Sequence, residues 1–175
     1  MTHIADHERA DICDLLDKIG PDQPTLCEGW RTRDLAAHLV LREARPDAAA
    51  GIAIPFLAGW TSRVQNSYSA GDFSRLVDRL RSGPPIWSPM RPAPLNEAGN
   101  GIEFFIHHED IRRAQPEWKP RTLDVTTEDL FWRRVKFASK SSLRRKGFGL
   151  DVVRADTGER RTLRATAPGE SDVTI

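Results

Sequence analysis

The sequence is poor in cysteine, with only Cys13 and Cys27 among 175 residues. These two residues lack the close Cys-x-x-Cys spacing of zinc knuckles and thioredoxin-like sites, so the sequence indicates neither a disulfide framework nor a thiolate metal site. A chain with so few thiols is typical of a reducing compartment. We therefore predict a cytoplasmic protein.

Long hydrophobic runs are also missing. The most apolar stretch, Ala48–Trp60, is shorter than the roughly 20 residues that a membrane helix requires, and Pro55 interrupts it. We expect this stretch in the core, and we expect no membrane partner. The amino-terminal MTHIADHERAD has neither the basic nor the apolar region of a secretory signal, so none is predicted.

Neither sign of charge is in excess, because 26 basic residues face 25 acidic ones for a net charge of +1. This balance excludes a protein that attracts polyanions over its whole surface. One basic segment, Arg133–Lys146, leaves nucleic-acid binding open, since Arg133, Lys136 and Lys140 share a helical face. We expect a solvated helix face instead, because no stacking aromatic residues are interleaved with these charges.

Apolar spacing predicts a mainly α-helical chain, since hydrophobic residues recur every three or four positions between glycine and proline breaks. The expected helices cover residues 5–18, 32–45, 46–68, 73–80, 96–115 and 126–142. The expected N-caps are Thr32, Asp72 and Thr126 or Thr127. Pro55 should break the third helix, and the prolines within 82–94 predict an irregular crossing.

The pattern changes after Gly147. Residues 148–155 and 160–167 have the composition of strands and flank the turn-like residues 156–159, which predicts a β-hairpin. Residues 172–175 resemble the start of a third strand that has no partner. Because so small a sheet leaves exposed edges, we expect the natural chain to continue beyond Ile175.

The stretch Gly101–Asp110, GIEFFIHHED, places acids and histidines in an apolar helix. Glu103 and His107 are four residues apart, so they lie on one helix face and can chelate a single ion. Asn100 and Asp110 fall on the same stripe. The alternative is a hydrogen-bonded Glu–His pair that binds no metal.

His38 is a candidate third ligand, since it lies on or beside the face that the second helix should bury. A lone histidine in such a place is more often an ordinary core residue. Three ligands from two packed helices would nevertheless make a catalytic type of metal site, with the fourth position left for water or substrate.

Two other placements of histidine are less favourable. His3 and His7 form a His-x-x-x-His pair, but they lie at a terminus that is expected to fray. His108 should point about 100° away from His107 on a helix, so both cannot easily bind the same ion. We therefore expect His108 to support the site or line its pocket.

Two motifs together resemble a known family. The segment PTLCEGWRTRDLAAHL, Pro24–Leu39, followed by the helix that contains Glu103 and His107, resembles the DinB/YfiT-like metalloprotein superfamily. The similarity is greatest to the branch of mycothiol-dependent maleylpyruvate isomerases and uncharacterised actinobacterial metal-binding proteins. It covers about residues 5–142.

The resemblance implies a DinB-like four-helix bundle over residues 1–145. A small α+β or β-hairpin region, incomplete in this chain, would follow over residues 146–175. The resemblance also implies a divalent metal, often zinc in relatives, bound by His38, Glu103 and His107. Many relatives have three histidines, whereas a glutamate in the middle position agrees with the isomerase-like branch.

Relatives are thought to bind a low-molecular-weight thiol at the ion as its thiolate. The resemblance therefore implies a metal-dependent thiol S-transferase or isomerase that acts on a small molecule through a metal-bound thiolate, with mycothiol as cosubstrate. Candidate residues for proton transfer or ligand orientation are Asn100, His108 and Asp110.

Two further classes of function stay open. One is a non-catalytic helical module that binds or senses metal, and a closed shell of four ligands would favour it. The other is a nucleic-acid accessory protein that uses Arg133–Lys146. The residues do not identify the substrate or the metal, and they leave a homodimer open.

Overall fold

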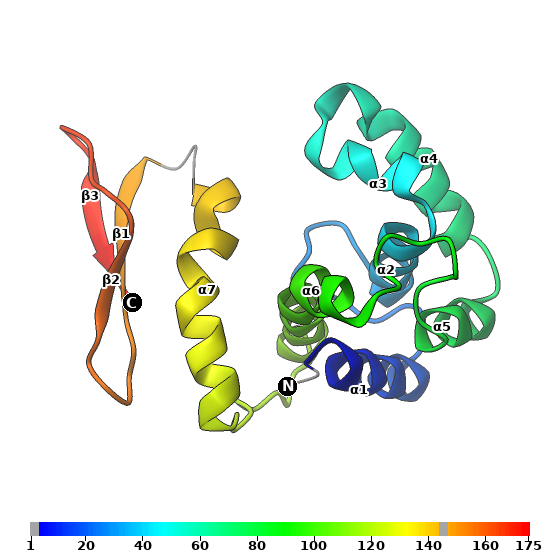
Figure 1. Cartoon of the computed structure of the whole chain (residues 1–175), viewed down its shortest axis with the longest axis horizontal. Coiled ribbons are helices and arrows are strands. Elements are labelled where there is room, and N and C mark those ends of the chain that lie inside the picture. The colour runs from blue at the N-terminus through cyan, green and yellow to red at the C-terminus, as the bar shows by residue number, and fades with distance from the viewer. Residues whose placement is uncertain (1–3, 144–146) are drawn as a thin grey trace. The chain divides into compact units, whose positions relative to one another are not determined.

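The structure is a computed structural model that describes residues 4–143 and 147–175, with side chains omitted for 137–143. It is mainly helical and has a small sheet near the C-terminus (Figure 1). The chain divides into two compact units, one up to Arg121 and the other from Thr122. This boundary lies before the predicted one at residue 145, because the last helix packs against the strands that follow it.

The first unit contains six α-helices and one short 3-10 turn within the described residues. These are α1 (Ile4–Ile19), α2 (Thr32–Ala44), α3 (Pro46–Ala53), η1 (Pro55–Leu57), α4 (Ala58–Ser69), α5 (Phe73–Arg81) and α6 (Ala93–Arg113). The predicted break at Pro55 is confirmed. Helix α6 begins earlier than predicted, since Pro94 fits a first turn, where a backbone N–H is not needed.

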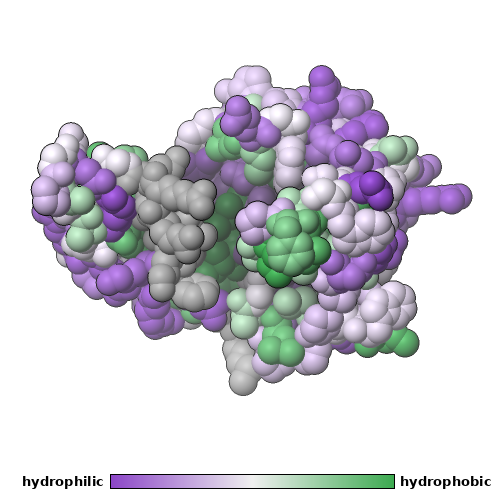
Figure 2. Space-filling view, turned by 90° about the horizontal axis from the view of Figure 1, so that it is seen from above, coloured by the Kyte–Doolittle hydropathy of each residue, from purple (hydrophilic) through white to green (hydrophobic). Residues whose placement is uncertain are grey.

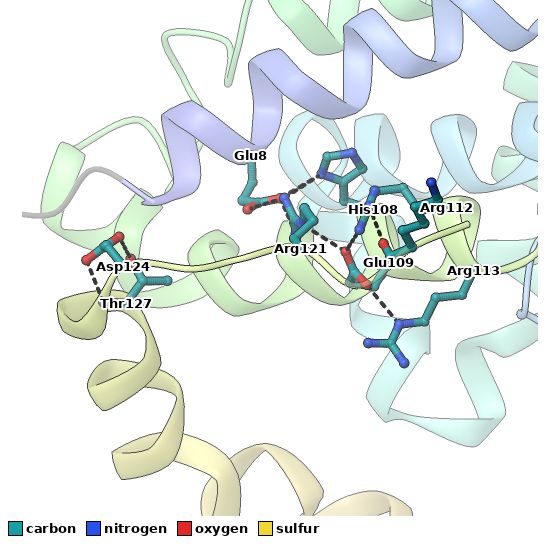
Figure 3. A network of polar contacts seen from close by, with 9 residues as sticks. Glu8, His108, Glu109, Arg112, Arg113, Arg121, Asp124 and Thr127 are labelled. Carbon is teal, nitrogen blue, oxygen red and sulfur yellow. Dashed lines mark hydrogen bonds and ion pairs between the residues drawn. The ribbon is translucent and has the colours of Figure 1, made fainter. Parts of the chain in front are cut away.

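Two of the three predicted N-caps are wrong. Asp72 is confirmed, because its carboxylate accepts a hydrogen bond from the Arg75 N–H at 3.0 Å. Thr32 instead lies inside the first turn of α2, where its hydroxyl donates to the Gly20 carbonyl at 2.6 Å. Asp124 precedes α7 (Val125–Leu143) and accepts from the N–H and the hydroxyl of Thr127 (Figure 3). A carboxylate at a helix N-terminus also interacts favourably with the helix dipole.

Helices α1, α2, α5 and α6 surround the main hydrophobic core of the first unit. Its fully buried side chains include Ile12, Leu16, Leu35, Leu39, Val77, Leu80, Phe104 and Ile111. Burial of one such side chain contributes about 1.5 to 3 kcal/mol. This packing holds α2 against α6 and thereby sets the distance between their polar residues. In the described part of the chain, no helix combines the length and apolarity needed to cross a membrane.

The expectation that Ala48–Trp60 is core is wrong for most of that stretch. Only Ala48 and Gly51 are buried there, because α3 and α4 pack on α2 through one side. The exposed large hydrophobic residues of this stretch are Ile52, Ile54, Phe56 and Trp60. Figure 2, which looks onto the α3–α4 end of the first unit, shows hydrophobic residues interrupting a largely hydrophilic surface.

The second unit consists of α7 and a three-stranded sheet, with β1 (Phe148–Val153), β2 (Arg160–Arg164) and β3 (Ser171–Thr174). The predicted antiparallel pairing of β1 with β2 is confirmed. The third strand has a partner, contrary to prediction, because β1 lies in the centre of the sheet and pairs with β3 in parallel on its other edge.

Candidate metal centre

Helices α2 and α6 bring His38, Glu103 and His107 together. The Oε1 atom of Glu103 lies 3.6 Å from His38 Nε2 and 3.2 Å from His107 Nε2. Potential ligand atoms of all three residues lie within 4.8 Å of one another. In a tetrahedral zinc site with bonds of about 2.0 to 2.2 Å to nitrogen and oxygen, neighbouring ligand atoms are about 3.3 to 3.6 Å apart. The observed separations are those of a site that could hold one such ion.

His38 is oriented by the residues around it. Its neighbours Ala37 and Leu39 are fully buried, whereas the His38 side chain lies at the edge of the core with 6% of the residue exposed. The indole of Trp30 packs on the imidazole with ring centroids 5.0 Å apart, and the His107 ring meets it edge-on at 5.2 Å. Aromatic contacts of this kind restrict the His38 ring to the side that faces Glu103.

The charges of the cluster are strongly coupled. Burial would raise the pKa of Glu103, but hydrogen bonds with His107 and His38 and the nearby charge of Arg42 hold it well below its usual range. The guanidinium of Arg42 lies 3.2 Å from Glu103 Oε1. Burial lowers the pKa of His38. Glu103 is therefore ionised and His38 is neutral, as a cation site requires.

His107 has a second set of polar contacts on its other ring nitrogen. Its Nδ1 atom lies 3.0 Å from Asp110 Oδ2, and the thiol of Cys27 donates to the same oxygen at 3.3 Å. Burial opposes the charged imidazole, but hydrogen bonds with Asp110, Cys27 and Glu103 outweigh it and raise the pKa of His107 to about 11. A carboxylate that accepts from Nδ1–H is the usual partner of a metal-binding histidine.

Cys27 was not among the candidate residues from the sequence. The one sequence feature that pointed to Cys27 was its position inside the motif at Pro24–Leu39, shortly before Gly29 and Trp30. The helical stripe identified Asp110, but a residue from a loop has no periodicity that could reveal it. Only the fold places the Cys27 thiol beside Asp110 and His107.

Asn100 lies on the predicted stripe of α6 but belongs to a different polar cluster. Its side-chain amide donates to Glu43 at 2.8 Å and to Asn96 at 2.9 Å. Arg9 makes a two-pronged ion pair with the same Glu43 carboxylate and places its guanidinium over the Phe104 ring. Asn100 is therefore held in a buried network between α1, α2 and α6, and it does not support His38 or His107 through a hydrogen bond.

His108 faces α1 (Figure 3). Its Nδ1 atom lies 2.8 Å from the Glu8 carboxylate, which also binds Arg121 at 3.0 Å. Burial would raise the pKa of Glu8, yet the hydrogen bonds with His108 and Arg121 lower it. Arg121 also pairs with Glu109 at 2.8 Å. His108 thus takes part in a buried ionic network of the first unit, on a different side of α6 from its neighbour in sequence.

The remaining candidate positions are not assembled into a site by the described residues. His7 is exposed, and His3 lies outside the described residues. In the basic segment, Arg133 and Lys136 are exposed, while the side chain of Lys140 lies outside the described ones.

Comparison of this chain with protein families, with curated proteins and with solved structures finds no match. Its function is therefore inferred from the arrangement of His38, Glu103 and His107 and from the motifs that surround them.

Proposed function

We propose that α1, α2, α5 and α6 form a DinB-like four-helix bundle that binds one divalent cation, zinc by preference, through His38, Glu103 and His107. The convergence of three potential ligand atoms from two helices carries this proposal. Glu103 and His107 would meet on any helix because they are one turn apart. His38 comes from another helix and approaches the same carboxylate oxygen.

The donor set suits such an ion. Two imidazoles and one carboxylate are ordinary zinc ligands, and three protein ligands leave a position for a further group. An ion that binds here would displace the extra proton of His107, and Glu103 would then supply the one negative charge among the three ligands. The site would thus keep an excess of positive charge, to which Arg42 adds. An anionic group is the natural occupant of the remaining position.

The chemistry that follows is thiol chemistry. A divalent cation in this site would favour the deprotonated form of a thiol, which is the nucleophilic form. We infer a metal-dependent thiol S-transferase or isomerase, with mycothiol as the thiol and a small molecule as the substrate. Of this chain's own residues, Asp110 orients the His107 ring, Trp30 packs on His38, and Arg42 holds the Glu103 carboxylate.

Metal analysis tests the site itself. The Cys27→Ser chain, in which the thiol beside His107 cannot compete for the ion, should contain one zinc ion after loading and removal of excess. The further change His38→Ala, Glu103→Ala in that chain should leave markedly less. His7→Ala is the matched control, because His7 is exposed on α1 and should leave metal content unchanged. Equal zinc in the Cys27→Ser chain with and without these two further changes would reject the site.

Calorimetry tests the thiol. Mycothiol should bind to the zinc-loaded Cys27→Ser chain with measurable heat and should bind much more weakly to the same chain without zinc. Retention of zinc without any binding of mycothiol would leave a non-catalytic metal-binding module as the function.

A further inference from the structure

The two ring nitrogens of His107 face two different groups of potential ligands. Nε2 faces Glu103 and His38, whereas Nδ1 lies 3.0 Å from Asp110 Oδ2 and 3.9 Å from the sulfur of Cys27. The sulfur in turn lies 3.3 Å from Asp110 Oδ2. Cys27, His107 and Asp110 thus place a sulfur, a nitrogen and an oxygen within 4.8 Å of one another.

We propose that Cys27, His107 and Asp110 form a second cation site that binds thiophilic divalent ions such as Zn²⁺, Co²⁺ and Cd²⁺. With a zinc–sulfur bond of about 2.3 Å and bonds of about 2.0 to 2.1 Å to nitrogen and oxygen, ligand separations of about 3.3 to 3.6 Å are expected. The observed separations of 3.0, 3.3 and 3.9 Å span this range. Thiolate and imidazole ligands together favour zinc and related ions over magnesium or calcium.

The charges of its ligands favour tight binding of a divalent ion at the second site. The thiolate of Cys27 and the carboxylate of Asp110 together neutralise a divalent ion. In the first site, which His38, Glu103 and His107 form, Glu103 is the single anionic ligand. The guanidinium of Arg42 lies beside Glu103, but no arginine or lysine pairs with Asp110 among the residues that the structure describes. The second site therefore balances the charge of the ion more completely, and the first keeps more of its positive charge for an incoming anion.

The fold holds Cys27 in place for this role. The Thr25 hydroxyl accepts from the Cys27 N–H at 3.2 Å and donates to the Trp30 carbonyl at 2.9 Å. The Leu26 N–H donates to the backbone carbonyl of Asp110 at 3.0 Å, which ties the loop to α6 beside the site. The thiol is half-buried, so an ion from solution can reach it.

The two sites exclude one another because they share one imidazole. A neutral imidazole has one nitrogen free to bind an ion, and the other carries a hydrogen. An ion at Nδ1 leaves Nε2–H to donate to Glu103, and an ion at Nε2 leaves Nδ1–H to donate to Asp110. This inference deepens the proposed function, since His107 belongs to both sites and only the first site would be open to a thiol cosubstrate.

Cobalt spectroscopy tests the second site without any activity assay. Binding of Co²⁺ to a thiolate gives an intense near-ultraviolet charge-transfer band, which nitrogen and oxygen ligands do not give. The band should appear on titration of the parent chain with CoCl₂ under reducing conditions. It should also appear in the variants His38→Ala and Glu103→Gln, which lose only the first site.

The band should disappear in Cys27→Ser and remain in Cys13→Ser, whose native thiol is fully buried away from both sites. Circular dichroism of each variant checks that its helices are intact. Absence of the band in the parent chain and in both first-site variants would overturn the proposal, as would its persistence in Cys27→Ser.

Failure of this proposal can be told apart from failure of the first site. If Cys27→Ser still binds one cobalt ion, and the double variant Cys27→Ser, His38→Ala binds none, the first site is supported independently of the second. If His38→Ala and Glu103→Gln keep the full thiolate band and Cys27→Ser binds no cobalt at all, the second site is supported and the first is rejected.

Discussion

His38 and Glu103 come from different helices, and their Nε2 and Oε1 atoms lie 3.6 Å apart. The contact exists because α2 packs against α6 in the first unit. It extends a pair of groups on one helix, Glu103 and His107, into a set of three potential ligands. The proposed metal centre depends on this contact more than on any other.

Replacement of His38 by alanine should lower the affinity for zinc at the first site by at least about 100-fold. Loss of a group that only supports a ligand costs about 10- to 100-fold, and direct loss of a ligand should cost more. The measurement is competition with a chromophoric chelator in the Cys27→Ser background, which removes the second site. An unchanged dissociation constant in the double variant would contradict the assignment of His38.

Removal of the metal should lower the melting temperature of the chain. A ligand present at 100 times its dissociation constant stabilises the folded state by about 2.7 kcal/mol. Differential scanning calorimetry with zinc, and then with excess chelator, measures this difference. The variant His107→Ala should melt at the same temperature in both conditions, because His107 belongs to both sites. A zinc-dependent shift that persists in this variant would show that the ion binds elsewhere.

Replacement of Glu8 by glutamine should destabilise the first unit by about 3 kcal/mol at pH 7. The change removes the carboxylate that pairs with His108 and Arg121, so that Arg121 keeps only Glu109 as an ion-pair partner, and breaking a buried ion pair is costly. The pKa of Glu8 is lowered in the folded chain, so its stabilisation is present above the ordinary value of 4.5 and is lost as the pH falls through the lowered value.

Urea unfolding at several pH values between 7 and 3 measures this effect. The difference in unfolding free energy between the parent chain and Glu8→Gln should be constant near neutrality and should shrink in the acid range. A difference that grows on acidification would contradict the assignment.

Replacement of Asp72 by alanine should destabilise α5 by about 1 kcal/mol, because the Arg75 N–H loses its cap. Asp78→Ala in the same helix is the control, since Asp78 is exposed and its carboxylate accepts no hydrogen bond among the described residues. Chemical denaturation of both variants gives the comparison. Equal effects of the two changes would mean that the cap contributes little.

The two thiols should differ in reactivity. Cys13 is fully buried, and burial raises its pKa to about 12, so it should react only when the chain unfolds. Cys27 is half-buried in a loop and should react with a thiol reagent in the native chain. If the second cation site is correct, zinc should slow the reaction of Cys27. Reaction of Cys27 at the same rate with and without zinc would count against its role as a ligand.

Local patterns predicted most helices of the first unit and the β-hairpin of the second, because apolar spacing and turn residues act over a few positions. The same local geometry related Glu103 to His107 and separated His107 from His108. The helical stripe was less informative for Asn100, because a neighbouring helix supplies Glu43 as its partner.

By itself the sequence determined which residues share a helix face, since backbone geometry alone sets spacing over one or two turns. Only the tertiary structure decided that His38 approaches Glu103, that the loop thiol of Cys27 reaches Asp110, and that β3 pairs with β1. These contacts join segments far apart in the chain. They form because burial of the core and pairing of the sheet fix the distances between those segments, which no short sequence pattern encodes.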